Sequence, residues 1–236
     1  MALPPSDATN EAFLREVDEE YRRDRLLNIW RNYGRWIVVA VVAALVGFAG
    51  WLYLSHRASS AAGVQGEQYD AALHLVEENQ PDKAMPEFEK LAKSGAEGYA
   101  ALSRITLGNL LLQKGDAKGA AAKFAEVAAD ASYPQPYRDL ALLRQTSTEY
   151  DTLKPEQVIE RLRGLAVPAS PWFGTAGEMV AASYLKQGKR ADAGKLYGQI
   201  AQGGENVPES IRQRAVTLAG VLGVDAIDQS TGNTAQ

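Results

Sequence analysis

The stretch AAAKFAEVA, residues 120–128, contains a pattern that recurs three more times in the chain. A small or β-branched residue is followed by a large one at +4, an apolar one at +7 and an alanine at +8. In an α-helix these positions lie on one face, so each copy predicts a helix that buries a single stripe. The other copies are AMPEFEKLA (84–92), VIERLRGLA (158–166) and AGKLYGQIA (193–201).

A second helix is predicted before these patterns, and it ends on glycine at Gly115 and Gly188, a residue that readily adopts the left-handed conformation closing a helix. The copies are spaced 36, 38 and 35 residues apart. Two helices per copy at this period predict a solenoid of helical hairpins. The residues expected to pack between the two helices of the hairpins are Ala84, Phe88, Gly108, Ala120, Phe124, Val158, Leu162, Ala181, Ala193 and Tyr197.

The second copy resembles the tetratricopeptide repeat family, because Gly108 and Ala120 stand twelve residues apart, where that family brings two helices together. Ala181 takes the place of the glycine in the fourth copy. The third copy departs from the pattern with Thr146 and Val158, so an irregular loop is expected around residues 151–155.

A longer correspondence links PQPYRDLA (134–141) to PESIRQRA (208–215) at an offset of 74 residues. Two copies and the opening of the next helix therefore resemble one duplicated unit. The last helix, residues 208–222, has no following partner and is expected to cap the array. The predicted fold is all-α, with one transmembrane helix followed by about four repeats and a capping helix.

Residues 36–54 form an uncharged apolar run of nineteen residues, about 28 Å long as a helix and close to the thickness of a bilayer core. Its flanks hold the residues expected at the membrane interface: Arg35, Trp36, Trp51, Tyr53 and Arg57. A cleavable signal remains an alternative, since small residues follow at 58–61. The long acidic and basic segment before the run favours a permanent anchor.

Basic residues indicate the orientation of the anchor, because they are retained on the cytoplasmic side. Six arginines lie in residues 15–35, whereas Arg57 is the only Lys or Arg in residues 56–76. The N-terminus is therefore predicted inside and the repeats outside the cytoplasm. The same arginines are equally suited to attract anionic lipid headgroups.

The expected organisation has five parts. Residues 1–35 form a cytoplasmic segment with an amphipathic basic helix, 36–54 the transmembrane helix, 55–63 a linker, 64–223 the repeat domain and 224–236 a disordered tail.

Composition argues against several classes of function. The chain has no cysteine, so a thiolate metal site cannot form, and its net charge of −4 argues against nucleic acid. His56 and His74 stand too far apart for a metal site or a catalytic pair. No constellation for an enzyme, a cofactor or a small-molecule substrate is found. Trp172 is expected to plug the core between hairpins, with an exposed contact to a partner as the alternative.

The motifs VDEEYRRDRLLNIWRNYGRW (17–36), YRDLALLR (137–144), SPWFGTAGEM (170–179) and PESIRQRA (208–215) together resemble bacterial inner-membrane proteins described as ancillary subunits of the SecYEG translocon, which are related to the repeat domain of a cell-division coordinator. That resemblance implies a single span, a cytoplasmic N-terminus and periplasmic repeats. It implies a scaffold in the periplasmic chaperone network, with SecYEG and a membrane-bound periplasmic chaperone as partners. The alternative is a tethered envelope scaffold for cell division or another complex.

Overall fold

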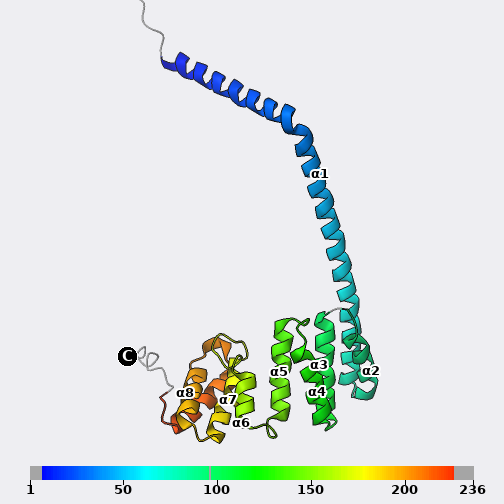
Figure 1. The fold of residues 1–236 in the computed structure, drawn as a ribbon, viewed down its shortest axis with the longest axis vertical. Coiled ribbons are helices and arrows are strands. Elements are labelled where there is room, and N and C mark those ends of the chain that lie inside the picture. The colour runs from blue at the N-terminus through cyan, green and yellow to red at the C-terminus, as the bar shows by residue number, and fades with distance from the viewer. Residues whose placement is uncertain (1–6, 96, 226–236) are drawn as a thin grey trace, which may run out of the picture. The chain divides into compact units, whose positions relative to one another are not determined.

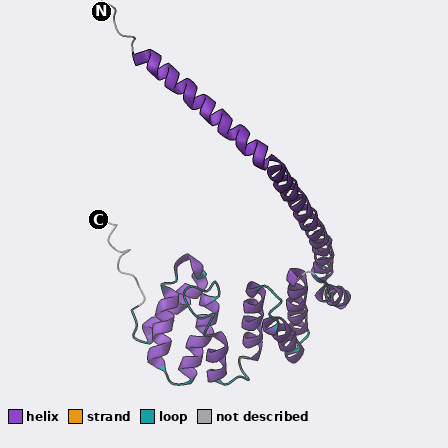
Figure 2. Cartoon of the chain, turned by 45° about the horizontal axis from the view of Figure 1, so that its top comes forward, coloured by secondary structure: helices purple, strands orange, loops and turns teal. Residues whose placement is uncertain are grey.

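The computed structural model describes the backbone of residues 7–95 and 97–225, and the side chains of residues 33–56, 63–95 and 97–225. Throughout these residues the chain is helical between short turns, and no strand occurs among them. Figure 2 shows the helices and the loops that join them. The chain divides into two compact units, Met1–Ala61 and Ala62–Gln236.

The first helix, α1 (Asp7–Glu77), is longer than the sequence suggested. The expected basic helix, the apolar run and the linker at residues 55–63 are all stretches of α1. The backbone of the stretch expected as a linker is therefore helical and continuous with the apolar run. The physical reason is that residues 55–62 contain neither proline nor glycine, and alanine is the best helix former. The expected tail at 224–236 lies outside the described residues from 226 onwards.

The second unit contains four helical hairpins and a final helix (Figure 1). The end of α1 pairs with α2 (Pro81–Ala92), α3 (Glu97–Gln113) with α4 (Ala117–Ala129), α5 (Gln135–Glu149) with α6 (Pro155–Leu162), and α7 (Phe173–Lys186) with α8 (Arg190–Ala201). A short 3-10 turn, η1 (Gly204–Asn206), leads into α9 (Glu209–Val221). The all-helical fold with a capping helix is thus confirmed.

Several of these helices end in the same way. Gly115 and Gly188 have φ of 81° and 74°, and Asn79 takes the same left-handed conformation at the end of α1. In each case the next residue donates its backbone N–H to a carbonyl five residues earlier, as in Asp116 to Leu111 at 2.9 Å. This Schellman motif satisfies carbonyls that a helix end otherwise leaves open. The third hairpin has no left-handed residue between α5 and α6.

The third hairpin also has the shortest of the second helices. The pattern at 158–166 predicts a helix through Ala166, but α6 ends at Leu162, and this expectation is wrong. Gly164 and Pro168 follow closely and disfavour continuation of the helix. Leu165 is nevertheless buried, because a turn beyond the helix end directs it into the core.

The duplicated unit is visible in the structure as α3–α4–α5 and α7–α8–α9. Both α5 and α9 are preceded by a proline in the same extended conformation, Pro134 at φ −57°, ψ 140° and Pro208 at φ −52°, ψ 139°. Ala141 and Ala215 are both fully buried. Leu143 of α5 is buried against the following helices, whereas Thr217, its counterpart in α9, is exposed.

Candidate partner-binding surface

The residues expected to pack between helices all lie in the interior of the second unit. The structure buries Ala84, Phe88, Gly108, Ala120, Phe124, Val158, Leu162, Ala181, Ala193 and Tyr197. Apart from Gly108, they are divided among three hydrophobic clusters, one around the end of α1, α2 and α3, one around α3, α4 and α5, and one around α6 to α9. These clusters fix the surface that the repeats present outwards.

Glycines set the closest approach between paired helices. A methyl group added at Gly108 would lie 2.5 Å from Cε1 of Phe124, so the Phe124 ring packs directly on the α3 backbone. In the fourth hairpin Ala181 takes the place of Gly108, and a comparable close contact lies one helical turn earlier at Gly177, where a methyl would lie 2.9 Å from Cδ1 of Ile200. A close approach was expected between Gly108 and Ala120. At Gly108 it is a contact of the α3 backbone with the ring of Phe124, which lies one helical turn after Ala120.

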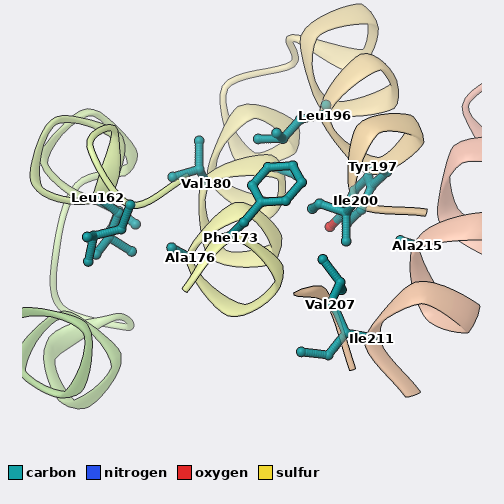
Figure 3. Packing of buried hydrophobic residues seen from close by; sticks show 14 of the residues in the cluster. Leu162, Phe173, Ala176, Val180, Leu196, Tyr197, Ile200, Val207, Ile211 and Ala215 are labelled. Carbon is teal, nitrogen blue, oxygen red and sulfur yellow. The ribbon is translucent and has the colours of Figure 1, made fainter. Parts of the chain in front are cut away.

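The cluster around α6 to α9 is centred on Phe173, which is 1% exposed. Figure 3 shows its ring near Val180 of α7 and the α8 side chains Leu196 and Ile200. Ile211 of α9 and Val207, in the segment before α9, complete this cluster. Trp172 precedes Phe173, is only partly buried, and packs against the same cluster.

Phe173 is the core residue that the sequence argument missed in favour of Trp172. Phe173, Ala176 and Val180 stand at i, i+3 and i+7, and all three are buried. That apolar spacing was the available signal for the inward face of α7. Trp172 lies one residue off this stripe, which leaves part of its ring at the surface.

Polar contacts join neighbouring helices of the second unit at the surface. Arg214 of α9 donates from Nε and Nη2 to the Glu178 carboxylate at 2.9 and 2.8 Å, and this paired contact raises the pKa of Arg214. Arg161 of α6 donates to Glu149 of α5. The Lys186 ammonium lies 4.1 Å from the centre of the Tyr150 ring.

The histidine and carboxylate side chains of the second unit bear on whether it could hold a metal ion. His74 lies at the surface beside Glu77 at 3.1 Å and Asp70 at 3.5 Å, both on its own helix. Among the described residues no group of three His, Cys, Asp or Glu side chains is placed to hold a metal ion. What the unit does present is a set of shallow grooves.

Two of these grooves occupy matching places in the duplicated unit. One, of about 360 Å³, lies across α2, α3 and α4 and includes Leu107 and Arg104. The other, of about 230 Å³, lies across α6, α7 and α8 and includes Val180 and Tyr184. Leu107 and Val180 are equivalent residues at the offset of 73, so both grooves follow from the repeat architecture.

In the first unit, the segment Tyr33–His56 of α1 is long and apolar enough to cross a membrane. Every large apolar side chain from 36 to 54 is exposed, with Trp36 and Trp51 at 63% and Tyr53 at 66%. Arg35 is exposed as well, and the side chain of Arg57 lies outside those described. These properties fit a single-pass anchor, whose apolar surface would be covered by lipid.

A family model described as a tetratricopeptide repeat-like domain matches residues 28–217 of the chain. The matched range includes the apolar segment of α1 as well as the four hairpins. A search of the curated proteins found no match.

Proposed function

The chain belongs to the tetratricopeptide repeat-like family, and from this we propose that it is a membrane-anchored, non-enzymatic scaffold that binds protein partners through its repeats. The observation that carries the proposal is the extent of the match, which begins before the apolar segment and ends in α9. Anchor and hairpins thus belong to one family unit. Solenoid repeats present an extended surface that binds partners through its shape and its exposed side chains, and this binding needs no reactive groups.

We place the anchor in a bacterial inner membrane, with the N-terminus in the cytoplasm and the repeats in the periplasm. The support is the distribution of six arginines before the span against Arg57 alone after it. The absence of cysteine from the chain is compatible with an oxidising compartment.

We further propose that the protein is an ancillary subunit of the SecYEG translocon, acting in the periplasmic chaperone network with a membrane-bound periplasmic chaperone. This rests on the resemblance of the motifs at 17–36, 137–144, 170–179 and 208–215. A scaffold there would hold chaperone and channel together while a polypeptide emerges.

Copurification from intact membranes after mild crosslinking tests this role. The full chain is expected to retain SecYEG, and replacing residues 36–54 by a poly-leucine helix is expected to weaken the association, because Gly47 and Gly50 allow a neighbouring helix to approach closely. The repeats should remain folded, as judged by circular dichroism of both proteins.

The alternative, a tethered envelope scaffold, predicts another result. If the unaltered chain retains no SecYEG, the translocon role is wrong and the tethered scaffold is favoured. If poly-leucine changes nothing, the contact belongs to the repeats.

A further inference from the structure

An open groove of about 520 Å³ lies between α4 and α5. Its floor is formed by Ala117, Ala121 and Ala125 of α4, and its other side is lined by Thr148 of α5 and by Thr152 in the turn after α5. The short helix α6 packs mainly against α7. This side of α4 is therefore left without a neighbouring helix.

The duplicated unit shows what such a face accepts. Gly194 and Gly198 of α8 are the counterparts of Ala121 and Ala125 at the offset of 73. A methyl at Gly194 would lie 3.0 Å from Cγ2 of Val224, and one at Gly198 would lie 3.1 Å from Cγ1 of the same side chain. The chain's own segment after α9 thus places an aliphatic residue on this face of α8.

The segment after α5 does not do the same for α4. Tyr150 is the counterpart of Val224 at the offset of 74, but its hydroxyl donates to the Met179 carbonyl at 3.5 Å and its ring lies beneath Lys186. Both partners are on α7. The residue that would fill the groove is therefore engaged elsewhere.

The charge at the groove favours a bound segment in which an acidic residue stands next to the aliphatic one. Lys118 is exposed at the groove and, within the described residues, makes no ion pair. Glu149, the acidic residue of the lining, is paired with Arg161. The groove therefore presents an uncompensated positive charge. In the chain's own docked segment, Asp225 directly follows Val224.

We propose that the α4–α5 groove binds a short segment of a partner protein in which an aliphatic residue is followed by an acidic one. The aliphatic side chain lies on Ala121 and Ala125, and the carboxylate faces Lys118. The assignment deepens the proposed scaffold function and rests on it, because it names the surface a protein partner uses. On α4 the methyl groups of Ala121 and Ala125 stand where α8 has Gly194 and Gly198. The bound segment therefore lies farther from the helix axis of α4 than Val224 lies from that of α8, and it exchanges readily.

The probe is a fluorescein-labelled, amidated peptide with the sequence of residues 218–225, LAGVLGVD, titrated against the full chain in lipid nanodiscs by fluorescence polarisation. Ala125→Phe fills the groove and is expected to weaken binding at least tenfold. The matched control is Ala129→Phe, an exposed position at the end of the same helix, which should stay within twofold. Lys118→Glu, a surface change that leaves the fold intact, should weaken binding about fivefold.

The peptide itself supplies a second comparison, since Val224→Ser in the probe should weaken binding at least tenfold. Equal affinities of the Ala125→Phe and Ala129→Phe proteins, or no saturable binding, would overturn the proposal. Self-association of the full chain that Ala125→Phe abolishes would assign the groove to a second copy and overturn it as well. None of these readouts involves SecYEG, so failure of the translocon role is recognised separately by copurification.

Discussion

At the scale of single residues, the contact between Gly108 and the Phe124 ring determines how closely α3 and α4 approach. The ring is fully buried, so it has no solvent-filled space into which it can move. Any side chain at position 108 has to displace it. The small residue at 108 and the large one at 124 therefore act as a pair.

Gly108→Ala is expected to destabilise the repeat unit by about 1–3 kcal/mol, because overpacking outweighs the better helix propensity of alanine. Urea unfolding followed by circular dichroism measures the change. The control is Gly220→Ala in α9, where an added methyl would meet nothing within 4 Å. That variant should be neutral or more stable by up to about 1 kcal/mol, and equal losses at the two positions would contradict the packing described.

Tyr69 gives the unit a dependence on alkaline pH. Burial raises the pKa of Tyr69 above its ordinary value of 10.0, although its hydroxyl also shares a hydrogen bond with Thr106 at 2.8 Å. Above that pH the unfolded chain loses the proton first, so the free energy of unfolding falls as pH rises towards the folded-state pKa. Tyr69→Phe should reduce this slope in urea titrations above pH 10. An unchanged slope would show that the hydroxyl is not responsible.

At the scale of elements, the second helix of each hairpin was predictable because a single stripe decides its register. In each of these helices the large residue is buried together with the residue four positions before it, whichever residues occupy the exposed face. The large residues are Phe88, Phe124, Leu162 and Tyr197. The end of α6 was not predictable from the same stripe, because Leu165 continues the pattern while Gly164 stops the helix. The helix-breaking effect of Gly164 therefore outweighed the apolar periodicity that Leu165 continues.

Trp172 and residues 55–63 illustrate two other limits. Trp172 was expected to plug the core, yet the position on the helix face decides burial, and it selects Phe173. The position of residues 55–63 between the apolar run and the first repeat suggested a linker, yet the alanines and serines at 58–62 are compatible with helix. The α4–α5 groove was also hidden, because it depends on the path of the chain after Tyr150.

The glycine at the end of α7 provides a test at this scale. Gly188 has φ of 74°, where a side chain costs about 1–2 kcal/mol. Gly188→Ala should therefore lower the free energy of unfolding by about that amount in urea denaturation. Gly164→Ala, at a turn without positive φ and with open space around it, should change it by much less. Similar losses would argue against the left-handed end of α7.

At the scale of the whole molecule, α5 joins the two halves of the repeat unit. Ala141 on one side belongs to the cluster around α3, α4 and α5, whereas Leu143 on the other belongs to the cluster around α6 to α9. Arg161 and Tyr150 add polar contacts across the same junction. The two halves are therefore expected to unfold together.

The proposed orientation is tested on the full chain. A reporter that is active only outside the cytoplasm should work when fused after Gln236 and fail when fused near Asp18, because the arginines before the span are retained inside. Colony assays with both fusions measure this, with immunoblots to equalise expression. The reverse pattern would overturn the orientation and the proposed compartment.

The offset of 73 to 74 residues also bears on how such a chain grows. A further copy of the unit inserted after α9 would turn the present cap into an interior helix like α5. Thr217 would then have to become apolar, as Leu143 already is, and Val224 would have to leave α8 as Tyr150 has left α4. Lengthening the array by one module thus requires few changes in the old cap, and each new copy opens another groove for recruitment.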